Sequence, residues 1–271
     1  MDPVTAVGAG LAVIGSKDIL VKILGPTAEY FGGEAKNLVQ RCNVNLDNIF
    51  VIARKKLGPR IDEPGSVSPR VLKHVIDDGK FCDDSIVADY YGGILASSKS
   101  ENNRDDRGVA ILATIKSLSV YQLRLHYLFY SIIYSTYNGR AMNLGTDQNR
   151  MNMYIPFSVY VKAMDFSPSE DASGILIHSV QGLVRSGLVT SHYSYGSKQH
   201  LAKRFHEAPE DGFIMGPNVY GAEVFLWGQG IKGATGHEIV EPKLRLPPPQ
   251  FAIPNGWLPT DTKSAVPPNT E

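Results

Sequence analysis

Apolar residues recur at steps of three and four through most of the first half of the chain, a period that predicts amphipathic helices packed along one face. The expected helices cover residues 27–57, a segment after Pro69, and residues 83–97, 109–118 and 119–133. Residues that favour helix ends or N-caps delimit them: Gly58, Pro59, Ser68, Asp83, Asp84 and Ser119. The last helix is apolar on most sides, which indicates a place in the centre of a bundle.

The pattern changes after residue 137. Residues 138–155 are rich in Asn, Gly and Met without a period, and we interpret them as a flexible linker that can mark a domain boundary. A helix over 169–185, a strand over 188–195, a loop, a strand over 212–215 and a helix from Pro217 follow. Helix, strand, long loop, strand and helix in this order is the layout of a winged-helix-like module, with residues 196–209 as its wing.

The two ends of the chain differ from its body. Residues 1–20 are small, apolar and Gly-rich, but lack both a basic leader and the run of about 18 apolar residues that a spanning helix needs. Such a segment suits close helix packing, or peripheral membrane contact through residues 4–24. Prolines recur through residues 231–271 at a density that precludes a helix, so we expect an extended or disordered tail.

These patterns predict a mainly α protein. A helical N-terminal bundle over residues 21–137 is followed by a small winged-helix-like α/β module at 156–230 and by the Pro-rich extended tail. The 271 residues, 43% of them hydrophobic, can bury one sizeable core or two small ones. Because 27 basic residues balance 27 acidic ones, no global field attracts the chain to nucleic acid or anionic lipid, and such binding requires a local patch.

The two cysteines, Cys42 and Cys82, lie in apolar-periodic segments without a CxxC pair or a Cys/His cluster that could bind zinc. This indicates two buried thiols in a reducing compartment. We therefore expect a cytoplasmic protein, with membrane association as the alternative.

A polar island, Arg104-Asp105-Asp106-Arg107, separates two apolar segments and supplies the catalytic candidates. Paired carboxylates can bind a divalent metal ion for phosphodiester cleavage, and an arginine can stabilise transition-state charge. On this hypothesis the protein is a metal-dependent nuclease or another toxic enzyme that uses Asp105 and Asp106. Adjacent residues on one turn rarely converge on one metal, however, so a helix cap with arginine–carboxylate pairs is the favoured interpretation.

Basic side chains gather in the predicted wing and make it the candidate nucleic-acid contact: Lys198, His200, Lys203, Arg204 and His206. Tyr193, Tyr195 and Phe205 lie among them. A basic loop with aromatic residues can bind backbone phosphates and stack on unpaired bases, as in a winged-helix DNA-binding regulator. Many winged-helix modules bind only proteins, so a protein partner or a homo-oligomer is the alternative.

Recognised catalytic motifs are absent from the sequence. The seven histidines are dispersed, and no HExxH-like pair, GxSxG elbow, GxxxxGK[ST] loop or Cys/His dyad occurs. We therefore predict no bound metal, no cofactor and no small-molecule substrate, and the expectation of an enzyme is lowered.

Four segments resemble the Abi-alpha (abortive infection alpha) family of bacterial proteins: LGPTAEYFGGEAKNLVQR at 24–41, PRVLKHVIDDGKFCDDSIVADYYGGILASS at 69–98, RDDRG at 104–108 and LSVYQLRLHYL at 118–128. GLVRSGLV and GPNVYGAEVFLW resemble the family's closing strand and terminal-helix signature, so the resemblance covers most of residues 20–230. It implies a component of antiphage defence that acts by protein or nucleic-acid binding. The family brings no established catalytic residue to carry over.

Overall fold

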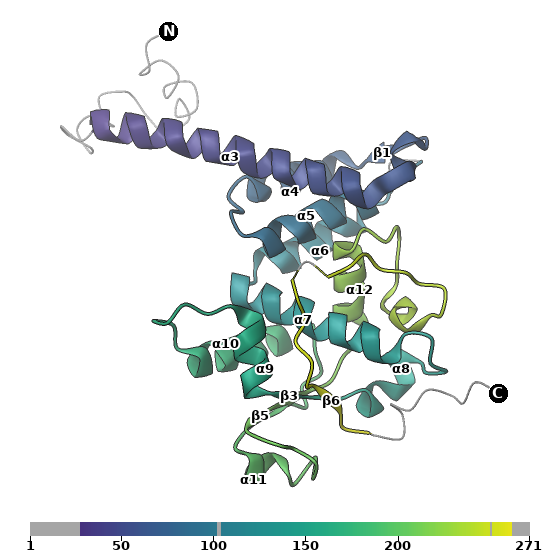
Figure 1. Cartoon of the computed structure of the whole chain (residues 1–271). Coiled ribbons are helices and arrows are strands. Elements are labelled where there is room, and N and C mark those ends of the chain that lie inside the picture. Colours follow the sequence, from purple (N-terminus) through teal and green to yellow (C-terminus); the bar gives the residue numbers. More distant parts are fainter. Residues whose placement is uncertain (1–27, 102–103, 250, 262–271) are drawn as a thin grey trace.

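The structure of the chain is a computed structural model, which describes residues 28–101, 104–249 and 251–261, with side chains from Gln40 onward (Figure 1). The segment 1–20 and the predicted membrane contact of residues 4–24 lie outside the described residues. A long first helix lies across one end of a helical body, and a small sheet lies at the other end. The prediction of a mainly α fold is confirmed.

The predicted helices of the first half are present: α3 (Ala28–Leu57), α4 (Pro69–Gly79), α5 (Ser85–Ser97), α6 (Arg107–Lys116) and α7 (Val120–Tyr137). Their start signals act through side chains. Asp84 Oδ1 accepts the Ile86 N–H at 2.8 Å, and Ser119 forms a reciprocal capping box with Gln122. A 3-10 turn, η2 (Gly58–Asp62), follows α3, and two short antiparallel strands, β1 (Ser66–Val67) and β2 (Lys99–Ser100), pair beside it.

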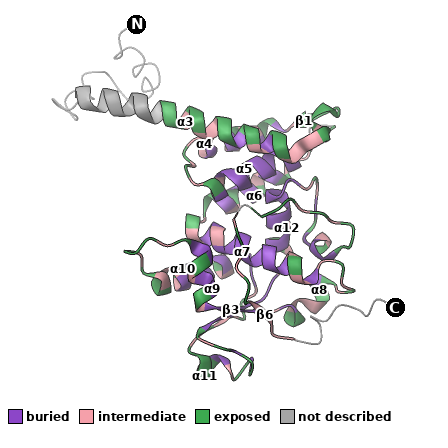
Figure 2. Cartoon of the chain, viewed as in Figure 1, coloured by how far each residue is buried: buried purple, intermediate pink, exposed green. Residues whose placement is uncertain are grey.

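The core lies where α5, α7 and α12 (Val219–Gly228) meet, and these three helices are buried along most of their length (Figure 2). One continuous apolar cluster runs from Ile49 on α3 to Val240 near the end of the folded body. The final helix of the predicted module is therefore packed in the same core as the helices of the first half. Phe50 of α3 and Ile76 of α4 are exposed, although the apolar period of these helices predicts one face packed on the core.

Close packing of α5 against α12 depends on Gly93. A Cβ atom at this position would lie 1.7 Å from the carbonyl oxygen of Gly228, which is backbone and cannot move aside cheaply. We expect Gly93→Ala to lower the free energy of unfolding by about 1–3 kcal/mol, measured in urea. Ser85→Ala, at an exposed position of the same helix, is the control; equal losses in both variants would contradict the close approach.

Residues 138–155 are structured, which corrects the expectation of a flexible linker. They contain α8 (Leu144–Asp147), the 3-10 turn η3 (Gln148–Arg150) and most of β3 (Met153–Pro156). Asn143 caps α8 by accepting the Gly145 N–H at 2.8 Å. This stretch has no period because its elements are too short to show one.

The remaining elements of the second half are α9 (Phe157–Met164), α10 (Ala172–Arg185), β4 (Ser194–Gly196), α11 (Lys198–Leu201) and β5 (Gly212–Met215). The strands form an antiparallel sheet in the order β4-β5-β3-β6. Gly187 follows α10 with a φ of 67°, the left-handed conformation that commonly ends a helix. The strand expected over 188–195 is shorter than predicted, because only an isolated bridge at Val189 precedes β4.

Both faces of this sheet are covered. Met153, Ile155, Phe213 and Met215 belong to the main core. The alternate residues of the same strands, Tyr154 and Ile214, belong to a second, smaller cluster on the other face. Because successive side chains of a strand point to opposite faces, a fully buried pattern on β3 and β5 requires a cover on each side.

Residues 241–249 and 251–261 of the C-terminal segment are exposed or half-buried, and apolar side chains among them, including Leu244, Phe251 and Trp257, pack against the main core. The segment begins with the 3-10 turn η4 (Gly236–Val240), which is mostly buried, and residues 241–249 and 251–261 contain no further helix. Tyr134 Oη donates to the Leu244 carbonyl at 3.2 Å, and Phe251 contacts Tyr127 at 5.3 Å between ring centroids. The segment ends in β6 (Leu258–Pro259), which pairs with β3.

Candidate nucleic-acid interface

The predicted wing forms a compact segment over residues 197–211, which we call the cap and which contains α11. Its five candidate residues, Lys198, His200, Lys203, Arg204 and His206, are all exposed. Leu201 and Phe205 lie between them in sequence and are buried in the small cluster on the outer face of the sheet. The buried residues therefore anchor the cap, and the basic residues face solvent around them.

The cap is tied to the sheet by named contacts. Tyr154 of β3 lies against Phe205, with ring centroids 5.5 Å apart, and its hydroxyl donates to the Glu210 carbonyl at 2.8 Å. Ser197 caps α11 by accepting the His200 N–H at 3.4 Å. These contacts hold the backbone of the cap in place, which reduces the backbone entropy that binding would cost.

Two acidic residues of the cap have hydrogen-bond partners, whereas two of its basic residues form no ion pair among the described residues. Asp211 accepts the Lys198 backbone N–H at 2.9 Å, and Glu210 accepts the Ser158 N–H at 3.1 Å, so both carboxylates serve the backbone. Among the described residues, neither Lys203 nor Arg204 forms an ion pair. Two cations on one exposed turn can meet the phosphates of a nucleic acid without first breaking an internal pair.

Tyr193 and Tyr195 form a stacked aromatic pair at β4, just before the cap. Their rings are stacked, with centroids 6.2 Å apart and planes 9° apart, and Tyr195 is 41% exposed. An exposed ring beside cations is a surface on which an unpaired base can stack.

Helix α10 presents a polar face next in the chain to this cap. Its buried side packs against α7, where Gly182 lies so close to Gln122 that a Cβ atom would meet the amide nitrogen at 2.0 Å. His178, Gln181 and Arg185 are exposed. The face is neutral apart from Arg185, so most of the positive charge must come from the cap.

The polar island of residues 104–107 lies away from the cap, at the start of α6 (Figure 1). Asp105 Oδ2 lies 2.7 Å from Arg107 Nη2, and the hydrogen bond from Arg107 lowers the pKa of that carboxyl. Asp105 also accepts the Arg107 backbone N–H at 3.2 Å, while Asp106 pairs with Arg70 of α4. The two carboxylates thus face different guanidinium groups.

Within the described residues, no cluster of three His, Cys, Asp or Glu side chains is suited to a metal ion. Comparisons of the chain with protein-family models, with curated proteins and with solved structures found no match. In the described part of the chain, no helix has the length and apolarity that crossing a bilayer requires. Both cysteines are free thiols at half-buried positions.

Two buried polar groups were not found from the sequence. Lys56 and Asp89 form an ion pair in the core, with Nζ and Oδ2 2.7 Å apart. His126 lies between Tyr90 Oη, at 2.6 Å from Nδ1, and the Gly221 carbonyl, at 3.1 Å from Nε2. Both groups lie among apolar helices, and their polar atoms find partners there. The only signal for them is a charged or imidazole side chain on a helix face that is otherwise apolar.

Proposed function

We propose that α7, β3, α9, α10, β4 and β5 form a winged-helix-like unit that binds nucleic acid through α10 and the cap at residues 197–211. The observation that carries this proposal is the sheet order β4-β5-β3 combined with the chain order α7, β3, α9, α10, β4, β5. The short elements α8 and η3 lie between α7 and β3, and the four-residue α11 lies between β4 and β5. In a winged helix the third helix is the recognition helix, and the loop between the last two strands is the wing. The unit would extend the module predicted at 156–230 to include α7 and β3.

The distribution of charge suggests different roles for the cap and for α10 in binding. The cap supplies exposed Lys198, Lys203 and Arg204, which bind phosphates and carry affinity without sequence information. Helix α10 supplies Gln181 and Arg185, side chains that can donate to base edges. Because the whole chain has no net charge, we expect weak, salt-sensitive binding that depends on this local patch.

The proposal is tested by changing Lys203 and Arg204, two cations of the cap that form no ion pair among the described residues. Lys203→Ala/Arg204→Ala is expected to weaken binding to duplex and single-stranded DNA and to reduce the slope of log affinity against log salt by about 2. Fluorescence anisotropy over a salt series measures both quantities. The control removes the same charge elsewhere, with Arg70→Ala/Lys73→Ala on α4. Wild-type protein that binds neither DNA at low salt would refute the proposal.

The biological setting that we propose is bacterial antiphage defence, which rests on the Abi-alpha resemblance of the sequence. The nucleic-acid proposal expects phage plating efficiency to rise when Lys203 and Arg204 are replaced. It expects Asp105→Asn/Asp106→Asn to leave protection unchanged, whereas a nuclease that uses this turn would lose it. Protection that survives the cap variant would instead favour a protein partner.

A further inference from the structure

The C-terminal strand β6 completes the surface on which the cap rests. We propose that Leu258 is a positioning residue for the wing, and that Arg150 latches it in place through Asp261. The inference rests on the proposed function for its consequence in binding, but its structural part can be measured without any ligand.

The register of the sheet shows how Leu258 reaches the cap. Ser194 pairs with Ile214, Ile214 with Tyr154, and Tyr154 with Leu258, so these four residues form one row across the four strands. Residues in one row point to the same face of an antiparallel sheet. The three apolar members therefore form a continuous floor on the outer face, and Leu258 is its outermost residue.

The cap covers this floor with Leu201 and Phe205, which are almost fully buried. Lys203 and Arg204 lie on the turn between those two anchors, so the positions of the cations follow the positions of the anchors. Without the Leu258 side chain, the apolar surface of Tyr154 and of the cap that faces the sheet would become exposed to solvent. The cap would then lose apolar contact at the border of its small core, which has few other residues.

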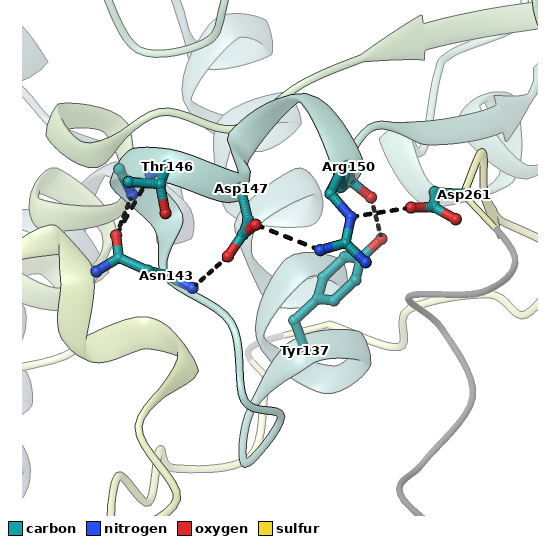
Figure 3. A network of polar contacts seen from close by, with 7 residues as sticks. Tyr137, Asn143, Thr146, Asp147, Arg150 and Asp261 are labelled. Atoms are coloured by element: carbon teal, nitrogen blue, oxygen red, sulfur yellow. Dashed lines mark hydrogen bonds and ion pairs between the residues drawn. The ribbon is translucent and has the colours of Figure 1, made fainter.

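Short contacts beyond the strand hold β6 against β3. The Thr260 N–H donates to the Asn152 carbonyl at 2.9 Å. Arg150 Nε lies 3.2 Å from Asp261 Oδ2, and its Nη1 lies 3.3 Å from Asp147 Oδ1 (Figure 3). Asp147 is itself fixed, because its Oδ2 accepts the Asn143 N–H at 2.9 Å. Arg150 is thus held by Asp147, and it contacts Asp261, which follows β6.

A two-residue strand is not stable by itself. We therefore expect that the Arg150–Asp261 ion pair and the packing of Leu258 together hold β6 on the sheet. The ion pair is exposed and contributes little by itself. We therefore expect Arg150→Gln to loosen the cap less than a change at Leu258.

The test uses Leu258→Asn in the full chain, with Leu258→Met as the conservative variant. Hydrogen exchange of the Ala202, Arg204 and Phe205 amides is expected to accelerate about tenfold in Leu258→Asn and to return to the wild-type rate in Leu258→Met. Leu244→Asn is the matched control, because Leu244 belongs to the same segment but packs on the main core. In Leu258→Asn, DNA affinity is expected to fall along with the protection of the cap amides from exchange.

Each outcome decides the inference. Unchanged exchange in Leu258→Asn, or equal acceleration in Leu244→Asn, overturns the positioning role. Faster exchange without loss of affinity, in protein that binds DNA, overturns its consequence for binding. Wild-type protein that binds no DNA refutes the proposed function, yet cap exchange that depends on Leu258 would still support the positioning of the cap.

Discussion

Replacing Lys56 with methionine is expected to lower the free energy of unfolding by about 3–5 kcal/mol, because it leaves the Asp89 carboxylate in the core without its cationic partner. The two side chains are only 6% and 2% exposed. Lys56 Nζ also donates to the Asp89 carbonyl at 3.0 Å and to the Gly228 carbonyl at 2.6 Å. One ammonium group therefore joins the end of α3 to α5 and α12.

The cost arises from burial. Removal from water lowers the pKa of Lys56, while the charge of Asp89 and its hydrogen bond oppose that shift and hold the ammonium form. Without the Lys56 ammonium, the Asp89 carboxylate loses an opposite charge that offsets the cost of its burial. Loss of the ammonium also leaves the Gly228 carbonyl without this donor, at the point where α12 ends.

Urea unfolding of Lys56→Met measures this loss, and Lys55→Met, one position earlier and exposed, is the matched control. The double variant Lys56→Met/Asp89→Leu is expected to be more stable than Lys56→Met, since an apolar pair can replace a buried ion pair with little loss. A double-mutant cycle then gives the coupling between the two residues. A loss in Lys56→Met no larger than that in Lys55→Met would contradict the role of the pair.

The sequence predicted the helices well because their signals are local. Asp84 and Ser119 cap the helices that they were expected to cap, and apolar periods set the positions of α3 to α7. The sheet was harder to predict, because β3 and β6 are short and their partners are distant in the chain. Leu258 pairs with Tyr154 across about a hundred residues, and no local pattern indicates that pairing.

For the candidate site, composition located a basic segment at residues 196–209 but did not predict its structure. The alternation of cations with Leu201 and Phe205 was visible in the sequence, yet a single buried turn gives no period that distinguishes a cap from a loop. The prolines of the C-terminal segment indicated extended chain and could not indicate that α7 binds it. Pro259 is compatible with β6 because β6 is an edge strand, where a missing N–H is tolerated.

Acidification is expected to destabilise the protein through His126. Burial lowers the pKa of this imidazole from 6.5 to about 3, and the Gly221 carbonyl, which accepts from Nε2, opposes the shift only in part. The ring is neutral in the folded state, with its Nδ1 accepting from Tyr90 Oη. In the unfolded chain the same imidazole gains a proton below its ordinary pKa.

The direction of the change in stability with pH follows from the number of protons that each state binds. Between about pH 6.5 and pH 3 the unfolded state binds one more proton than the folded state at His126, so stability falls as the pH falls. The slope approaches about 1.4 kcal/mol per pH unit, which sums to on the order of 4–5 kcal/mol across the window. Above pH 6.5 both states are neutral at this residue, and its contribution no longer changes with pH.

The contribution of His126 is isolated by comparing slopes, because carboxylates also reduce stability in acid. The free energy of unfolding of wild type and His126→Gln is measured from pH 7 to pH 4. The variant is less stable at neutral pH, since glutamine cannot reproduce both hydrogen bonds, but its stability is expected to fall less steeply with acid. His192→Gln, at an exposed position, should keep the wild-type slope. Parallel curves for wild type and His126→Gln would show that the imidazole is protonated in the folded state, and would contradict its burial as a neutral ring.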